Sequence, residues 1–208
     1  MQQLVLLGPP GSGKGTQANR LATHFGLLAY STGVVLRQEE AKSTPLGREI
    51  HNYLKVGSYV PDELILVIVR NALESAGGKC VLDGFPRTLA QGQALDHLIG
   101  DLGCHEPFAI HLEVDQQVLE SRVRSRVGCD GCGLVWANGE QPASCPSCDV
   151  PVASRIDDSQ ELYRARLAEY QKKTLPLLPF YEGKNRLHRV CGEGSPDAVF
   201  GRILAALL

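Results

Sequence analysis

Residues 4–16 read LVLLGPPGSGKGT, and this stretch decides how the rest of the chain is interpreted. A short apolar run of strand type is followed at once by a glycine-rich loop, a lysine and the start of a helix-like segment. Such a loop cradles phosphates, because its backbone N–H groups point inward, the helix start adds a positive dipole, and Lys14 adds a point charge. Glycines leave room for the phosphate oxygens. The stretch therefore predicts nucleoside-triphosphate binding.

The general form of this loop has Ser or Thr directly after the lysine. Here Gly15 takes that place, and Thr16 follows one residue later. A glycine-rich turn without function is the alternative, but the strand and helix signals on its two sides favour phosphate binding.

Length, composition and net charge limit which partners and which location the chain can be expected to have. The chain has 208 residues, 43% of them hydrophobic, and a formal net charge of −2. That charge gives no reason to expect nucleic acid or an anionic membrane as a partner. The apolar start is too short for a signal peptide or a membrane span. We therefore expect a cytoplasmic protein with no nucleic-acid and no membrane partner.

Strand and helix patterns alternate along the chain, which indicates a parallel sheet covered on both faces. Strand-like runs are residues 4–7, 80–83, 108–114 and 187–191. Helix-like segments are residues 16–25, 34–41, 46–56, 61–76, 89–98, 116–126, 158–174 and a last one opened by 195–197. We predict an α/β fold: a P-loop, doubly wound, five-stranded parallel sheet with a small zinc-binding lid.

Residues 128–153 break this alternation. Two pairs of cysteines with the spacing of zinc knuckles lie here: Cys129, Cys132, Cys145 and Cys148. Four thiolates leave a zinc ion no open position, so we predict a structural Zn²⁺. Chance or two disulfides are the alternatives, and disulfides are disfavoured without a secretion signal. Because residues 129–152 contain no Lys or Arg, the segment suits a lid better than a nucleic-acid reader. The remaining cysteines, Cys80, Cys104 and Cys191, are expected to be buried and inert.

Arginines gather around this segment. Arg122 and Arg126 are four residues apart and share a helix face, and Arg155 and Arg166 follow on the far side. Clustered guanidinium groups near a phosphate loop suit phosphoryl transfer, in which positioning and electrostatics dominate. Solvated helix faces with ordinary ion pairs are the alternative. Asp83 ends a predicted strand, where a carboxylate can hold Mg²⁺ or its waters.

Taken together, the motifs resemble the adenylate kinases over nearly the full length. The matching segments are GPPGSGKGTQ from residue 8, STG from residue 31 with Arg37, DGFPR from residue 83 with Gln91, the RxDD run from residue 155 with Arg166, and the four cysteines. The resemblance implies a core of residues 1–127 and 154–208, a monophosphate-binding segment of residues 31–60, and a lid of residues 128–153. It also implies a monomer and a cis peptide between Phe85 and Pro86.

Residue roles follow from the resemblance. It implies ATP contacts from Gly11, Ser12, Gly13, Lys14, Gly15, Thr16, Arg122, Arg126, Val135, Trp136 and Gly194. It implies AMP contacts from Thr32, Arg37, Ser58, Tyr59, Val60, Gly84, Phe85, Pro86, Arg87, Gln91, Arg155 and Arg166. It implies catalytic roles for Lys14, Arg87, Arg122, Arg126, Arg155 and Arg166. Mg²⁺ bound with ATP would lie near Thr16 and Asp83.

The implied activity is reversible, Mg²⁺-dependent transfer of the γ-phosphoryl group of ATP to AMP, giving two ADP. Val34 departs from the family pattern, which has Asp there, and so removes a carboxylate near the phosphates. Two alternatives remain: a kinase for UMP or CMP, and a non-catalytic P-loop protein that senses ATP. Thr32 and the long lid favour AMP over the pyrimidine nucleotides.

Overall fold

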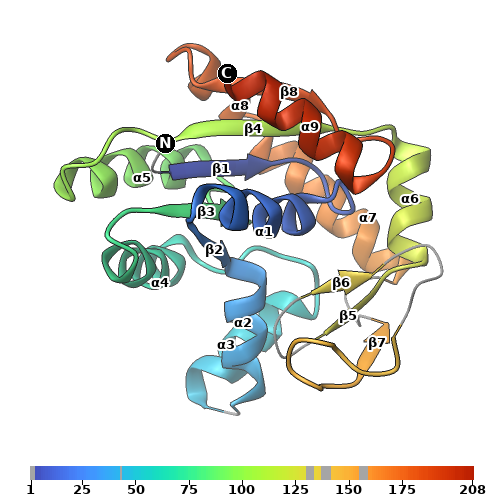
Figure 1. Ribbon diagram of the computed structural model, residues 1–208. Coiled ribbons are helices and arrows are strands. Elements are labelled where there is room, and N and C mark those ends of the chain that lie inside the picture. The colour runs from blue at the N-terminus through green and yellow to red at the C-terminus, as the bar shows by residue number, and fades with distance from the viewer. Residues whose placement is uncertain (1–2, 43, 130–133, 137–141, 155–158) are drawn as a thin grey trace.

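The computed structural model describes residues 3–42, 44–129, 134–136, 142–154 and 159–208 (Figure 1). The strands are β1 (Gln3–Leu7), β2 (Leu28–Ser31), β3 (Cys80–Asp83), β4 (Phe108–Glu113), β5 (Val127–Cys129), β6 (Val135–Trp136), β7 (Val152–Ser154) and β8 (Leu187–Cys191). The helices are α1 (Lys14–Phe25), α2 (Thr32–Ala41), α3 (Pro45–Leu54), α4 (Asp62–Ser75), α5 (Leu89–Asp101), α6 (Gln116–Arg124), α7 (Gln160–Glu169), the π-helical turn η2 (Tyr170–Thr174), α8 (Leu177–Glu182) and α9 (Pro196–Leu207).

The centre of the fold is a parallel sheet of five strands in the order β2-β3-β1-β4-β8. Strand β1 lies in the middle and is buried along its whole length. A strand buried on both faces has no polar side to present, which explains why residues 4–7 are all apolar rather than alternating. The predicted doubly wound α/β sheet is confirmed.

Helices cover both faces of this sheet (Figure 1). Leu4 and Leu6 of β1 pack on one face with apolar residues of α1 and α9. Val5 and Leu7 point to the other face and pack with residues of α4, α5 and α8. Successive side chains of a strand alternate between the faces, so one short apolar strand joins two separate cores.

Several elements differ from the sequence-based expectations. The sequence pattern marks four of the five strands of this sheet and does not mark β2. Helix α8 also lies outside the segments that it marks. The predicted helix over residues 158–174 divides into α7 and the π-helical turn η2, in which the N–H of Leu175 donates to the carbonyl of Tyr170 at 3.0 Å. Helix α6 ends at Arg124, two residues earlier than predicted.

Two smaller parts project from the sheet (Figure 1). One is the pair α2 and α3, and the other is a three-stranded antiparallel sheet in the order β6-β5-β7. Residues of both parts border the cavity described below. Among the described helices, none is long and apolar enough to cross a membrane.

The cysteines outside the knuckles only partly match expectation. Cys80 is buried in β3, as predicted. Cys104 is only partly buried, and Cys191 is exposed. The expectation of burial was wrong for Cys191, because β8 is an edge strand whose last residue alternates outward.

Candidate active site

The phosphate loop, residues 8–13, joins β1 to α1 at the carboxyl edge of the sheet. The chain order reverses between β1 and β4, which is where open α/β sheets bind ligands. Glycine is required at Gly11, because its φ is 86° and an added Cβ would lie 2.8 Å from Cγ2 of Val123. Helix α1 begins at Lys14, so its unpaired N–H groups and its dipole face the loop.

Lys14 reaches back into this loop. Its Nζ donates hydrogen bonds to the carbonyl oxygens of Gly8 at 2.8 Å and Pro9 at 2.9 Å. Burial lowers the pKa of Lys14 to about 8, although the carboxylate of Asp83 opposes the shift. The guanidinium groups that lower this pKa further are those of Arg87, Arg166 and Arg126. Lys14 and the three arginines together carry more positive charge than Asp83 neutralises, so an anionic ligand would be attracted here.

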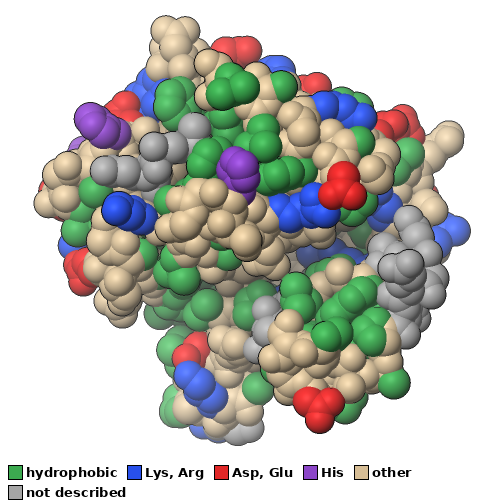
Figure 2. All heavy atoms as spheres, viewed as in Figure 1, with side chains coloured by type: hydrophobic (Ala, Val, Ile, Leu, Met, Phe, Trp, Pro, Cys, Tyr) green, Lys and Arg blue, Asp and Glu red, His purple; other side chains and the backbone are tan. Residues whose placement is uncertain are grey.

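A cavity of about 690 Å³ opens at this loop. Figure 2 shows this face hollowed between the sheet and the β5–β7 sheet, with Lys or Arg side chains gathered in the hollow. The predicted site residues that line the cavity are Gly11, Ser12, Gly13, Lys14, Gly15, Thr16, Arg37, Tyr59, Asp83, Gly84, Pro86, Arg87, Arg122, Arg126, Val135, Trp136, Arg166 and Gly194. Segments far apart in the sequence thus meet in one space large enough for nucleotides.

Arg87 enters this cavity from the turn after β3. The turn begins at Asp83 and contains the cis peptide between Phe85 and Pro86 that the resemblance implied. The Nε of Arg87 donates to the carbonyl of Gly84 at 2.7 Å, and its guanidinium carbon lies 4.8 Å from the centroid of the Tyr59 ring. The guanidinium group is therefore held at the cavity wall, with further N–H groups available to a phosphate.

Gln91 supports Arg87 rather than facing the cavity. It is only 2% exposed. Its Oε1 accepts from the backbone N–H of Arg87 at 2.7 Å, and its Nε2 donates to Oδ1 of Asp62 at 2.6 Å. Both ends of the amide are thus bonded to protein. In this arrangement Gln91 fixes the turn that carries Arg87.

The opposite end of the cavity is bordered by the loop after β8. The guanidinium group of Arg122 donates to the carbonyl oxygens of Gly192 at 3.0 Å and Gly194 at 3.5 Å. Arg202, which the sequence analysis did not single out, donates to the intervening carbonyl of Glu193 at 2.7 Å and to that of Cys191 at 2.7 Å. Two arginines from α6 and α9 therefore set the shape of this loop.

Oxygen ligands suitable for Mg²⁺ lie on the sheet side of the cavity. Thr16 and Asp83 both line it, and Oδ2 of Asp83 accepts a hydrogen bond from the hydroxyl of Ser31 at 3.3 Å. Val34 lines the same cavity without a carboxylate. A hydroxyl and one carboxylate beside a phosphate loop match the oxygen preference of Mg²⁺, which takes its other ligands from phosphates and water.

The remaining predicted residues do not line this cavity. Thr32, Val60 and Gln91 line a void of about 20 Å³, about the size of one water molecule, and Arg87 lines both this void and the cavity. Phe85 is fully buried in the apolar core, so it contributes packing. Ser58 donates its N–H to the carbonyl of Tyr53 and is absent from the described residues that line either space. Arg155 falls outside the described residues.

Sequence reasoning missed two cavity-lining residues of the η2 turn, Tyr170 and Thr174. The hydroxyl of Tyr170 lies 2.8 Å from Nε2 of His111, a buried residue of β4. Burial lowers the pKa of His111, so its imidazole is kept neutral at physiological pH. Because no motif marks these positions, only the geometry of the turn reveals them.

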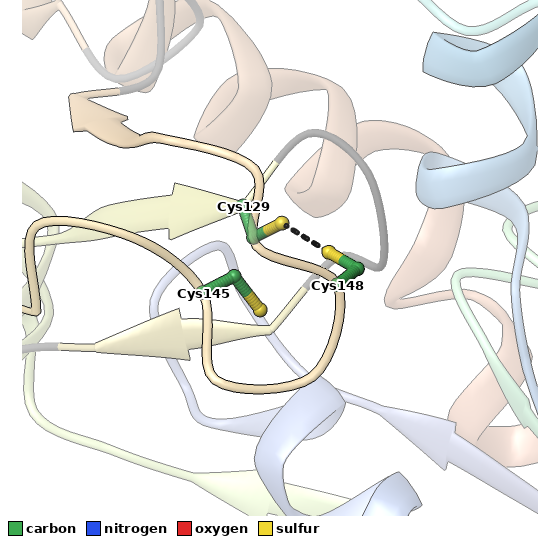
Figure 3. Close-up of side chains that lie close together, drawn as sticks. All are labelled: Cys129, Cys145 and Cys148. Carbon is green, nitrogen blue, oxygen red and sulfur yellow. Dashed lines mark hydrogen bonds between the residues drawn. The ribbon is translucent and has the colours of Figure 1, made fainter.

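Three of the four predicted zinc ligands come together (Figure 3). The Sγ atoms of Cys129, Cys145 and Cys148 all lie within 4.8 Å of one another, and those of Cys129 and Cys148 are 3.3 Å apart. The N–H groups of Cys148 and Asp149 both point to the carbonyl of Cys145, which folds a tight turn around the sulfur atoms. Cys132 lies outside the described residues. The described thiols converge as ligands of one tetrahedral ion must.

Comparisons with known proteins agree on one family. A sequence model of the adenylate kinase family matches residues 6–186. The chain is 40% identical to an adenylate kinase of Chlamydia caviae over 203 residues, which is 97% of this chain and 95% of that protein. It is 40% identical to an adenylate kinase of Thermus thermophilus over 206 residues, covering 99% and 97% of the two chains. An adenylate kinase of Paracoccus denitrificans is 38% identical over 205 residues, covering 96% and 94%.

Proposed function

The chain belongs to the adenylate kinase family and is a nucleoside monophosphate kinase; from that premise we propose how its own residues transfer the γ-phosphoryl group of ATP to AMP, giving two ADP. One observation carries the proposal. The phosphate loop and Lys14 line the cavity. Arg37 and Arg87, which lie outside that loop, line the same cavity. Two phosphate-bearing ligands could therefore meet in one space.

The proposed reaction needs no covalent intermediate on the protein. An oxygen of the AMP phosphate attacks the γ-phosphorus in line, and the bond to the β-phosphate oxygen breaks as ADP leaves. Lys14 and the phosphate loop hold the ATP phosphates, while Arg37 and Arg87 hold the phosphate of AMP. Arg126 and Arg166 stabilise the charge that spreads over the moving group. Arg155 joins this set in the proposal through its place in the family motif.

Bound Mg²⁺ would neutralise charge on the ATP phosphates, and Thr16 and Asp83 are the residues that would hold it or its waters. Arg122 would lie against the adenine of ATP, with Val135, Trp136 and the backbone of Gly194 around it. We further propose that residues 128–153 and 31–60 close over the ligands as lid and monophosphate-binding segment. Closure would exclude water, which competes with AMP as the acceptor.

We propose that the zinc site stabilises the lid and takes no part in the reaction. Cys129, Cys132, Cys145 and Cys148 would hold a structural Zn²⁺, because four thiolates leave no position for a substrate. The convergence of the three described thiols supports it. The strands beside it are short, so metal binding would supply folding energy that a hydrophobic core cannot. We expect a cytoplasmic monomer that acts on ATP, AMP and ADP, with no nucleic-acid or membrane partner.

Arg87→Ala tests the assignment of the monophosphate side. The variant loses the bidentate phosphate contact while the turn keeps its backbone bonds, so we expect kcat to fall by about 100-fold or more with thermal stability maintained. Arg124→Ala is the matched control, because Arg124 is an exposed arginine on α6. Turnover of Arg87→Ala within about threefold of the control would refute the assignment.

A further inference from the structure

Thr174 lies at the end of the η2 turn, where it is 5% exposed and lines the cavity. Its hydroxyl donates a hydrogen bond to the carbonyl oxygen of Arg87 at 2.9 Å. The oxygen of the Thr174 hydroxyl also lies 3.0 Å from the hydroxyl of Tyr59. A threonine hydroxyl has one proton, which goes to Arg87, so Tyr59 must be the donor in the second bond. The direction of both hydrogen bonds is thereby fixed.

Tyr59 gives Thr174 a second connection to Arg87. The guanidinium carbon of Arg87 lies 4.8 Å from the centroid of the Tyr59 ring, within the range of a cation–π contact. Thr174 thus holds the backbone of Arg87 directly, and it holds the guanidinium group through the ring that it anchors. Hydrogen bonds in series strengthen one another where water is excluded.

The η2 turn is itself fixed to the sheet and to the rest of the cavity. Tyr170 and Thr174, four residues apart, both line the cavity, and the Tyr170 hydroxyl is bonded to His111 of β4. The turn continues directly from α7, which carries Arg166. The π-helical turn therefore links the segment that holds Arg87 to the helix that carries Arg166, and such turns are frequent at functional sites.

We propose that Thr174 is a positioning residue for the monophosphate: it touches neither reacting group but sets where Arg87 presents its guanidinium. The inference rests on the proposed function of Arg87. Thr174→Val keeps the shape of the side chain and removes the hydroxyl, which leaves the Arg87 carbonyl and the Tyr59 hydroxyl without their shared partner. The cost of leaving these partly buried groups unpaired predicts that KM for AMP rises about tenfold, with KM for ATP within about twofold.

The test compares Thr174→Val, Thr174→Ser and Tyr59→Phe by steady-state kinetics and by calorimetric titration of AMP without ATP. Thr174→Ser keeps the hydroxyl and should restore AMP affinity to within about twofold of the parent chain. Tyr59→Phe removes only the second bond, so its loss should be smaller than that of Thr174→Val. Thermal unfolding and KM for ATP report whether each variant is folded.

The possible outcomes distinguish the positioning role from its alternatives. A selective loss of AMP affinity in Thr174→Val, recovered in Thr174→Ser, supports the positioning role. An unchanged KM for AMP in a folded Thr174→Val, or an equal rise for both nucleotides, overturns it. If Thr174→Val does not fold, an AMP affinity in Tyr59→Phe equal to that of the parent chain overturns it instead. A parent chain that transfers nothing to AMP refutes the proposed function, which is a different result.

Discussion

Raising the pH through 8 should weaken ATP binding, because Lys14 loses its proton there. Burial lowers the pKa of Lys14 to about 8, and bound phosphates would supply the negative charge that the cluster lacks. The pKa of Lys14 in the complex should therefore return toward the ordinary lysine value of about 10.4. Since the complex then binds more protons than the free protein, affinity must fall as the pH rises above 8.

The size of the effect follows from these two pKa values. At pH 8 about half of the free molecules carry a neutral Lys14, so binding should take up about half a proton. At about pH 9 the uptake should approach one proton. Between about pH 7 and pH 9 the Kd for ATP should rise about tenfold, which corresponds to about 1.4 kcal/mol.

The assay is calorimetric titration with the magnesium complex of ATP in two buffers of different ionisation enthalpy. The dependence of the observed heat on the buffer gives the number of protons taken up. Lys14→Met is the control: its affinity should be lower throughout and nearly independent of pH. Proton uptake near zero at both pH 8 and pH 9, or the same uptake in Lys14→Met, would refute the reasoning.

Asp96→Asn should lower the free energy of unfolding by about 3 kcal/mol, because it leaves Arg186, which is 7% exposed and bonded to it at 2.6 Å, without its buried counter-charge. Asp197→Asn, in an exposed pair, should cost less than about 1 kcal/mol, and equal losses in denaturant unfolding would contradict the argument. The parent chain should hold about one zinc ion, and Cys145→Ser should abolish this zinc content and lower Tm, whereas Cys191→Ser should change neither. A parent chain in which mass spectrometry finds no zinc would refute the site.

The sequence could predict the parts of the fold that depend on local pattern. The apolar run and the glycine-rich loop predicted β1, the phosphate loop and α1, although α1 begins at Lys14, two residues before the predicted start. By contrast, β2 has four residues, LAYS, none of them β-branched, and its pairing with β3 is what makes it a strand. Helix α8 contains Pro179, which is tolerated in a first turn, where no N–H is needed.

Charged residues that the sequence analysis singled out lie together: Lys14, Arg87 and Arg122 all line the cavity of about 690 Å³. Gln91 shows what the motif alone does not reveal: its amide bonds both Asp62 and the backbone of Arg87. Thr174 contacts Arg87 across 87 residues of sequence, and no spacing rule could reveal such a pairing.

The most direct test of the proposed function is a phosphotransfer assay with Mg-ATP and AMP, CMP, UMP or GMP, in which all nucleotides are separated by chromatography. We predict rapid formation of two ADP for each AMP consumed, with slow or no transfer to the other three. Preferential transfer to CMP or UMP would contradict the choice of substrate. Binding of ATP without transfer to any monophosphate would contradict the catalytic function itself.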